Sequence, residues 1–278
     1  MPNSFSCERP SDASWLALAI GNSRLHWAQF DRDEIVATWH TPPMASADID
    51  RLQASQFDFS PWCEVVLRSR IPLVVTSVVP QQLRLWRDRL PADVIELDDV
   101  PLQKLYPTLG VDRALAALGA GTQYGFPVLA IDGGTALTLT GVDGTRSFVG
   151  GAILPGLRSQ LTTLGQKTAA LPTIDLSIDL SGQTALPPRW ASDTPTAIRS
   201  GIVYTVLAGL RDFIETWWQQ YPRSAVVLTG GDGEILRRGL SELSPEIGAK
   251  VRCDANVLFW GMNASISFKT QPPLADDW

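Results

Sequence analysis

The chain has 278 residues, which is enough for one large domain or for two of modest size. Hydrophobic residues make up 45% of it and charged residues 19%, as in globular proteins with a substantial core. A net charge of −6 and the lack of a basic block make nucleic acids and anionic membranes poor candidate partners. Three widely spaced cysteines and two histidines argue against a disulfide framework and exclude a multi-histidine metal site.

The first 14 residues are polar, and we expect them to form a disordered leader. They lack the long apolar core of a signal peptide. No apolar run in the chain reaches the roughly 18 residues that a membrane-spanning helix requires. The sequence therefore predicts a soluble, cytoplasmic protein without a membrane partner.

The first predicted element after the leader is a hairpin over Trp15–Phe30. Its two β-prone halves flank the turn Gly21-Asn22-Ser23, and glycine beside asparagine is a frequent hairpin signal. Such a turn is usually structural, but several ATP-using folds also place a phosphate loop after their first strand. Four further elements are predicted before residue 100: a helix near Ala47–Gln56, a buried strand over Ile71–Val79, a helix over Gln81–Leu90 and a short strand over Val94–Asp98. This order indicates an α/β layer with partly parallel strand pairing.

An alanine-rich helix is predicted to begin just after Gly110. Asp112 lies in its first turn, where the helix dipole favours a carboxylate, so a purely structural role is open. Arg113 is harder to explain as part of a cap. A base beside a carboxylate-binding cation is a common way of holding a substrate. Gly119 and Gly121 are expected to close this helix rather than to form a dinucleotide-binding turn.

The stretch over Val128–Gly156 reads as a strand, a tight glycine turn over Asp132–Ala136 and a returning strand. A glycine turn lets backbone N–H groups approach a phosphate, because glycine has no Cβ in the way. A helix over Leu157–Thr163 is predicted next. The irregular stretch that follows, up to residue 192, is long for a compact domain and is expected to be a lid or an interface loop.

A long helix over Ala197–Gln220 is predicted next, with Thr194 at or within one residue of its N-cap. A buried strand, a glycine turn over Thr229–Gly233 and another helix follow. That geometry is typical of nucleotide binding at a helix N-terminus. No P-loop motif occurs anywhere in the chain. The last apolar segment, VLFWGMNASISF, fits either a strand or a helix.

Five of these blocks stand in the order of the type III pantothenate kinases, which the sequence closely resembles. The family pattern has D-x-G-N-T, G-x-D-R, D-x-G-T-A with G-G-x-I-x-P-G, N-T-x-x-A-I-x-x-G and T-G-G-D. The matching segments are 19–23, 110–113, 132–136 with 150–156, 193–201 and 229–232. The family belongs to the acetate and sugar kinase, Hsp70 and actin superfamily. The resemblance therefore implies an α/β fold of two ribonuclease-H-like (actin-like ATPase) domains, with mixed sheets flanked by helices and ATP between the domains. After a leader over residues 1–14, the expected halves are 15–125 and 126–278.

The resemblance also implies a role for each matching residue. Asp112 would be the general base, and Arg113 would face the carboxylate of pantothenate. Pantothenate would be held by Gly110, Val111, Asp112 and Arg113, with Thr194 and Tyr106 as further contacts. ATP with Mg²⁺ would be bound by Thr135 and by Ile20, Gly21, Asn22, Ser23, Arg24, Leu25 and His26. Asp132 would hold a monovalent cation, K⁺ or NH₄⁺. Members of the family are homodimers, with the pantothenate site near the dimer interface.

The sequence departs from the family pattern at Ala19, which replaces the first acid. Either Asp132 or Asp232 substitutes for that acid, or the magnesium is held mainly by ATP and water. The leading function is phosphorylation of pantothenate to 4′-phosphopantothenate, the first step of coenzyme A biosynthesis. The main alternative is a non-catalytic, nucleotide-binding regulatory relative that lost this acid. Retention of Asp112 favours the enzyme, because such a relative needs no base. A kinase for another small alcohol, such as a sugar, is disfavoured by the G-x-D-R motif with D-x-G-T-A at the expected distance.

Overall fold

A computed structural model describes residues 14–65, 67, 71–174 and 186–269. Residues 1–13 of the predicted leader, the middle of the irregular stretch before residue 192 and the C-terminal tail lie outside these ranges. The last residue assigned to the leader, Ser14, begins the first strand instead. The chain divides into two compact units. The first contains the described residues up to Pro101, together with Pro107–Leu115 and residues 262–269. The second contains Leu102–Tyr106 and the described part of Ala116–Gly261. A division at residue 125 into two related halves stays a prediction.

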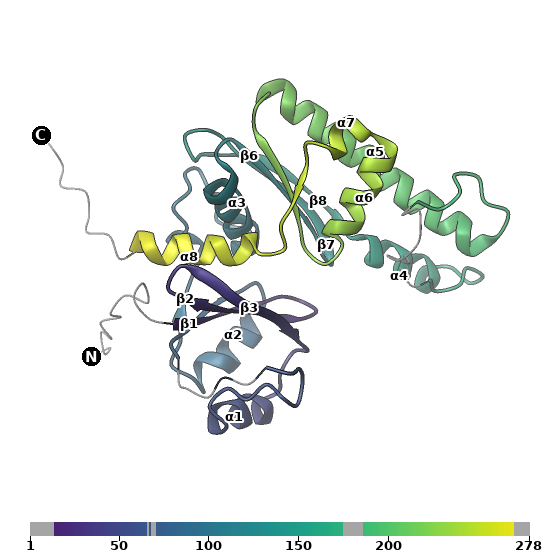
Figure 1. Cartoon of the computed structure of the whole chain (residues 1–278). Helices are drawn as coiled ribbons and strands as arrows, with labels where there is room; N and C mark the ends of the chain where they lie inside the picture. The colour runs from purple at the N-terminus through teal and green to yellow at the C-terminus, as the bar shows by residue number, and fades with distance from the viewer. Residues whose placement is uncertain (1–13, 66, 68–70, 175–185, 270–278) are drawn as a thin grey trace, which may run out of the picture. The chain divides into compact units, whose positions relative to one another are not determined.

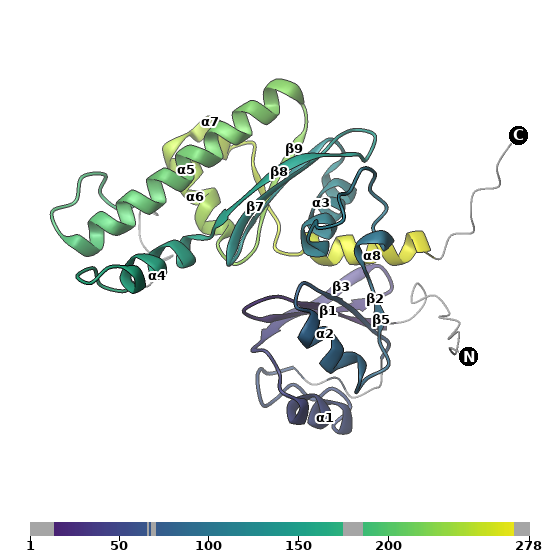
Figure 2. The same ribbon diagram turned by 180° about the vertical axis from the view of Figure 1, so that it is seen from behind.

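The first unit is built on a five-stranded mixed sheet with the strand order β3-β2-β1-β4-β5. Its strands are β1 (Ser14–Ile20), β2 (Leu25–Asp31), β3 (Glu34–Thr41), β4 (Leu73–Ser77) and β5 (Asp93–Val94). The first three form an antiparallel meander, whereas β4 runs parallel to β1 and β5 parallel to β4. Helices α1 (Ser46–Ala54) and α2 (Pro80–Arg87) lie on the same face of this sheet (Figures 1 and 2). The predicted hairpin and strand–helix–strand order are confirmed.

The core of the first unit lies between the sheet and these two helices. Because side chains alternate along a strand, β1 sends Leu16, Leu18 and Ile20 to the helix-covered face. Large aromatic side chains fill the space: the ring of Trp27 lies 5.4 Å from that of Trp86 on α2. The indole N–H of Trp27 donates a hydrogen bond to Oγ1 of Thr41. Because β1 and β4 are parallel neighbours, their C-terminal ends lie at the same edge of the sheet.

The second unit repeats the same topology in a sheet with the order β10-β9-β6-β7-β8. Its strands are β6 (Val128–Gly133), β7 (Ala136–Val142), β8 (Phe148–Pro155), β9 (Ala225–Thr229) and β10 (Arg252–Cys253). Again three strands form an antiparallel meander and two are parallel to the first. In this repeat Asp132 on β6 pairs with Thr229, just as Ala19 on β1 pairs with Thr76. Ala19 and Asp132 therefore occupy equivalent positions of the two sheets.

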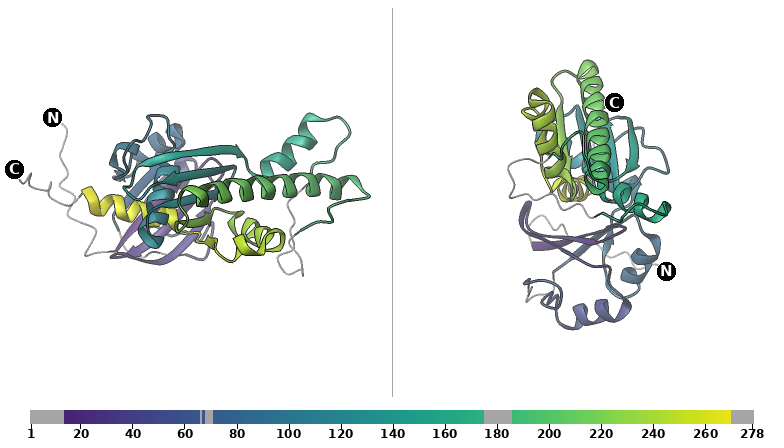
Figure 3. Two further views of the ribbon diagram at one scale, coloured as in Figure 1. Left: turned by 90° about the horizontal axis from the view of Figure 1, so that it is seen from above. Right: turned by 90° about the vertical axis from the view of Figure 1, so that its right-hand side faces the viewer.

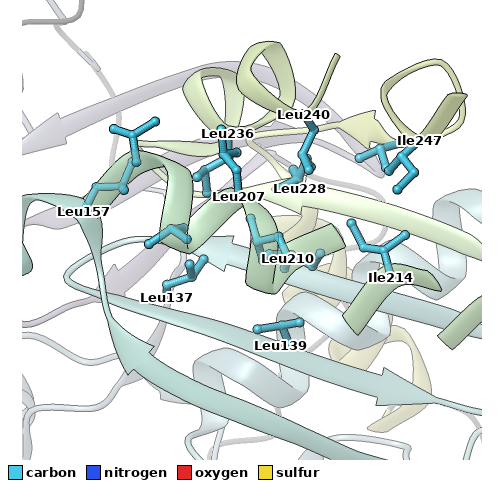
Figure 4. Packing of buried hydrophobic residues seen from close by; sticks show 14 of the residues in the cluster. Leu137, Leu139, Leu157, Leu207, Leu210, Ile214, Leu228, Leu236, Leu240 and Ile247 are labelled. Atoms are coloured by element: carbon cyan, nitrogen blue, oxygen red, sulfur yellow. The ribbon is translucent and has the colours of Figure 1, made fainter. Parts of the chain in front are cut away.

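One face of the second sheet is covered by α5 (Thr194–Gln220) and α6 (Gly233–Leu243), with α4 (Leu157–Lys167) and α7 (Pro245–Gly248) beside them. Figure 3 shows α5 running along this sheet. Apolar residues that repeat at helical spacing form a buried stripe on α5: Val203, Val206, Leu207, Leu210, Ile214 and Trp217. They pack against Leu137 and Leu139 of β7 and against Leu236 and Leu240 of α6 (Figure 4).

Helices α3 (Val111–Tyr124) and α8 (Val257–Lys269) each contribute residues to both units. The segment VLFWGMNASISF is therefore helical. Gly119 and Gly121 lie inside α3, so the expectation that they close it is wrong. A Cβ at Gly119 would collide with the backbone of Val257 and Gly261, so the glycine allows α8 to approach closely. Among the described residues, no helix is both long and apolar enough to cross a membrane.

Several other element boundaries also differ from prediction: α2 ends at Arg87 instead of Leu90, and α5 begins at Thr194 instead of Ala197. The strand expected over Val94–Asp98 is only two residues long, because the chain turns into a 3₁₀ helix over Leu97–Asp99. The backbone N–H of Glu96 donates to the Asp99 carboxylate, which favours this turn. Helix α4 extends four residues beyond the predicted end at Thr163, to Lys167.

Candidate active site

The turn between β1 and β2 is a tight loop at the edge of the first sheet. The N–H of Gly21 donates to the carbonyl oxygen of Arg24 at 3.1 Å, which closes the loop. A Cβ on Gly21 would lie 3.2 Å from that oxygen and 3.5 Å from Nε2 of His26. Asn22, Ser23 and Arg24 are exposed, whereas Leu25 is buried. The predicted residues from Ile20 to His26 thus span the end of β1, a turn over residues 21–24 and the start of β2, and the turn presents Asn22, Ser23 and Arg24 to solvent.

Ala19 stands at the position of the family's first acid, and its neighbours on the two adjacent strands have neutral polar side chains. Ala19 is 4% exposed and pairs with His26 on one side and with Thr76 on the other. The hydroxyl of Thr76 donates to the carbonyl oxygen of Ile95 at 3.1 Å. Burial, with the nearby His40 and Arg24, lowers the pKa of His26 to about 4. His26 is therefore neutral at pH 7. Because residue 19 is an alanine, it supplies no carboxylate that would raise the pKa of His26.

Asp112 lies in the first turn of α3, as predicted, with its carboxylate folded back onto the start of the helix. Its Oδ1 accepts a hydrogen bond from the backbone N–H of Arg113 at 2.8 Å. A Cβ on Gly110 would lie 2.5 Å from the same oxygen, so only glycine leaves room for the carboxylate there. Burial raises the pKa of Asp112 above its usual value, while the Arg113 N–H and guanidinium oppose the rise. A carboxylate with a raised pKa is a better proton acceptor than an ordinary surface aspartate.

The neighbouring Val111 and Arg113 are both buried, at 9% and 7% exposure. Arginine is rarely buried to this extent unless its charge is compensated. Gly110, Val111, Asp112 and Arg113 therefore form one compact motif in the first unit, in which a desolvated carboxylate and a guanidinium are adjacent in the chain. Such a pair can accept a proton from a hydroxyl and bind an anionic group.

In the second unit, the turn after β6 is held by the start of α4. The N–H of Gly134 donates to the carbonyl oxygen of Ala136, which closes the turn. The carbonyl oxygen of Thr135 accepts from the N–H of Gly156 at 2.9 Å and from Oγ of Ser159 at 2.7 Å. Asp132 and Thr135 are thereby fixed on one rigid turn, as the sequence predicts.

The turn after β9 packs directly onto this first turn. Gly230 has a φ of +80°, and a Cβ there would collide with Oδ1 of Asp132 and the carbonyl group of Gly133. The N–H of Asp232 donates to the Gly133 carbonyl oxygen at 2.8 Å. Asp232 is 4% exposed and forms an ion pair with Arg158 of α4, with Nε and Oδ1 3.6 Å apart. Two carboxylates thus flank the Gly133 turn.

The donor set at this turn suits a hard cation. Asp132 offers carboxylate oxygens, and the backbone of Gly230 lies so close to them that a Cβ there would collide with Oδ1. Hard cations prefer carboxylate and carbonyl oxygens. In the described ranges no three His, Cys, Asp or Glu side chains cluster as a metal site. Asp132 therefore fits a cation held by one carboxylate with backbone and ligand oxygens, rather than a closed protein cage.

Thr194 and Tyr106 belong to other parts of the second unit. Asp193 is the N-cap of α5, because its Oδ1 accepts from the N–H of Thr196 at 2.9 Å, and Thr194 is the first residue of the helix. A capping role therefore belongs to Asp193. Thr194 lines a groove of about 570 Å³ between α4 and α5, with Gln160 and Leu164 among its other walls. Tyr106 is 38% exposed, and its ring lies 5.5 Å from that of Phe148.

A family model described as type III pantothenate kinase matches residues 15–216, well over half of the chain. The chain belongs to the type III pantothenate kinase family. Two relatives bear the same name. The type III pantothenate kinase of a Nostoc species is 44% identical over 266 residues, which cover 91% of this chain and 94% of the relative. That of a Synechocystis species is 46% identical over 252 residues, covering 90% and 89%.

Two solved structures share the fold of this family member. A Campylobacter jejuni protein described as a Baf family transcriptional activator has a TM-score of 0.57 at 18% identity, covering 91% of this chain and 98% of that one. A Sinorhizobium meliloti protein described as a 2-dehydro-3-deoxygalactonokinase has a TM-score of 0.55 at 14% identity, covering 95% and 98%. Identities this low show the fold alone. With the two sheets of equal topology, they confirm the predicted actin-like ATPase fold.

The sequence predicted the glycine turn that contains Gly230 but not its close approach to Asp132, and the contacts of Ser159 and Arg158 were not predicted. Gly230 carries a signal in the T-G-G-D motif, because a positive φ favours glycine. Ser159 and Arg158 carry none, since a serine and an arginine at the start of a helix are ordinary surface residues. Their importance depends on contacts with Thr135 and Asp232, which are distant in the chain.

Proposed function

We propose that this protein transfers the γ-phosphoryl group of ATP to the primary hydroxyl of pantothenate, with Asp112 as the general base. The products are 4′-phosphopantothenate and ADP, and the reaction is the first step of coenzyme A biosynthesis. Membership of the type III pantothenate kinase family supports the reaction. The observation that supports the assignment of the base is the Asp112 carboxylate, buried at the start of α3 and directly followed by Arg113.

The proton transfer fits the environment of Asp112. A primary alcohol has a very high pKa, so its oxygen attacks efficiently only if a base accepts the proton as the bond to phosphorus forms. Burial raises the pKa of Asp112, which brings it closer to neutrality while leaving it an acceptor. Arg113, one residue on, would bind the carboxylate of pantothenate in a charge-assisted hydrogen bond. Gly110 and Val111 would line the same substrate contact.

ATP would be bound by the two glycine turns of equivalent topology. In the first unit these are the residues from Ile20 to His26, and in the second unit Thr135. Each turn combines a glycine with exposed polar residues, Asn22 and Ser23 in the first and Thr135 in the second, and glycine lets a phosphate approach the backbone. Mg²⁺ would be held mainly by the ATP phosphates and water, because Ala19 supplies no carboxylate. The metal supplies charge neutralisation on the transferred phosphoryl group.

The remaining assignments concern a cation, the substrate and a partner subunit. Asp132 would hold K⁺ or NH₄⁺ through its carboxylate. Thr194 and Tyr106 would be further pantothenate contacts. We also propose a homodimer, because the groove beside Thr194 has apolar walls, Leu164 and Ile198 among them, that a second copy would cover. A cytoplasmic location follows from the use of ATP.

Ala19 supports one alternative, a non-catalytic nucleotide-binding regulator. Loss of a metal-binding acid is typical of proteins that keep a nucleotide but no longer turn it over. Such a protein would have no reason to keep a desolvated carboxylate at Asp112, since burial of that charge opposes folding. The kinase is therefore the better-supported function.

Release of ADP tests the proposal directly. The purified protein is incubated with ATP, Mg²⁺ and K⁺, with and without pantothenate. Pantothenate-dependent ADP release is expected. ATP binding without ADP release above background would favour the regulator. Replacing K⁺ with Na⁺ tests Asp132 separately, because indifference to the cation would remove its proposed role.

A further inference from the structure

The ion pair between Arg158 and Asp232 adjoins the turn that carries Thr135. Arg158 is in the first turn of α4, immediately before Ser159, whose hydroxyl is bonded to the Thr135 carbonyl oxygen. Asp232 lies at the N-cap of α6, and its N–H is bonded to the Gly133 carbonyl oxygen. The Ser159 hydrogen bond therefore holds the start of α4 against the Gly133–Thr135 turn, and the contact with Asp232 holds the Arg158 guanidinium near the same turn.

The two partners of this ion pair differ greatly in exposure. The side chain of Asp232 is 6% exposed, whereas that of Arg158 is 56% exposed. The 3.6 Å between Nε of Arg158 and Oδ1 of Asp232 is longer than the roughly 2.7–2.9 Å of a tight charge-assisted hydrogen bond. A buried acid at a glycine turn thus anchors a largely exposed arginine by a loose contact. An arginine so held has its position restricted while its outer face stays accessible to an anion.

The charges around the turn favour a further cation there, beside the K⁺ or NH₄⁺ proposed at Asp132. Asp132 and Asp232 both lie against Gly133, and two carboxylates repel the phosphates of ATP. A neighbouring guanidinium offsets that repulsion. Its planar donor set also matches two oxygens of one phosphate better than a lysine would. Arg158 is the cation that an ion pair brings to this turn.

We infer that Arg158 binds the terminal phosphates of ATP and that Asp232 positions its guanidinium for that contact. The inference rests on the proposed function, in which Thr135 contacts ATP. The ligand class is a nucleoside triphosphate, and the contribution of Arg158 should grow with the number of phosphates. Arg158 is therefore expected to discriminate ATP from AMP, whereas contacts to the adenosine part would not.

Titration calorimetry of ATP and AMP with Arg158→Gln tests this inference. Loss of a charged hydrogen-bonding partner should weaken ATP binding by about 10- to 100-fold and leave AMP binding unchanged. Arg158→Lys keeps the charge but loses the planar fork, so it should recover only part of the loss. Arg211→Gln is the matched control, because Arg211 pairs with Glu215 on the exposed face of α5. It should leave both affinities unchanged.

A second variant separates phosphate binding from a purely structural role. If Arg158 only neutralises the buried Asp232, then adding Asp232→Asn to Arg158→Gln should restore ATP binding, and the inference would be overturned. If Arg158 contacts phosphate, the weakening should persist in the double variant. Thr135→Val distinguishes failure of the Arg158 contact from failure of the proposed nucleotide site. Weakened ATP binding by Thr135→Val with no effect of Arg158→Gln would refute the inference alone, whereas no effect of either variant would refute the proposed nucleotide site as well.

Discussion

Replacing Asp112 with asparagine separates catalysis from stability. The amide cannot accept the proton of the pantothenate hydroxyl, but its oxygen can still accept the N–H of Arg113. General bases contribute about 10²- to 10⁴-fold in rate, so Asp112→Asn should lower kcat by that factor, or about 3 to 5 kcal/mol in activation free energy. ATP affinity should stay near the wild-type value, because the Asp112 carboxylate is assigned no contact with the nucleotide.

The same substitution should not destabilise the protein. The folded-state pKa of Asp112 lies above its unfolded value, so the folded state binds more protons and its free energy of unfolding falls as pH rises through that interval. At pH 7 the charged, buried carboxylate therefore opposes folding, and a neutral amide removes that cost. The free energy of unfolding of Asp112→Asn should equal or exceed that of the wild type at pH 7, and the difference should shrink below pH 4, about the pKa of a free aspartate.

Asp143→Asn is the matched control for both readouts. Asp143 is a turn residue whose pKa is lowered by the N–H of Ser147 and the hydroxyl of Thr145. Its charged form therefore favours folding, so Asp143→Asn should reduce stability slightly and leave turnover unchanged. Denaturant unfolding and steady-state ADP release measure the two quantities. The reasoning fails if Asp112→Asn keeps more than a tenth of wild-type turnover, or if its loss of turnover accompanies loss of ATP binding or of folding.

Three further predictions address other parts of the site. Gly230→Ala should lower the melting temperature and abolish activation by K⁺, because the φ of Gly230 is +80° and the added Cβ would meet the Asp132 carboxylate. Unchanged activation by K⁺ would contradict the proposed cation site at Asp132. Thr194→Val should raise the KM for pantothenate and leave that for ATP unchanged, and equal effects on both would contradict the assignment. With a pKa of about 4 in the folded state, His26 must give up a proton it holds when unfolded, so wild-type stability should fall between pH 8 and pH 5. The difference in free energy of unfolding between wild type and His26→Gln, measured by denaturant titration, should change by about 2 kcal/mol between pH 8 and pH 5, and a pH-independent difference would refute it.

Local pattern was enough to predict most of the strands and the order of the motifs. Each glycine turn follows a β-prone run, and the stripe of α5 repeats at helical spacing, so neither depends on distant contacts. The Asp112 motif could be predicted for the same reason: its glycine, acid and arginine act within one helical turn. The equal topology of the two sheets was implied by the family resemblance alone.

Long-range contacts decide what local pattern missed. Gly119 looks like a helix terminator, but it lies inside α3 because α8, from the other end of the chain, packs against it. Arg158 is held near the Gly133 turn by Asp232, which is 74 residues further along the chain. The cap of α5 is by contrast a local contact: Asp193 is the N-cap and Thr194 lies one residue from it, within the predicted range.

Detection of the phosphorylated product is the most direct test of the central claim. The wild-type protein is incubated with ATP, Mg²⁺, K⁺ and pantothenate, and the products are analysed by mass spectrometry and ³¹P NMR. We predict 4′-phosphopantothenate, with the phosphoryl group on the primary hydroxyl, in equal amount to ADP and absent with Asp112→Asn. ATP binding with no phosphorylated pantothenate, or ADP release that is equal with and without pantothenate, would contradict the account.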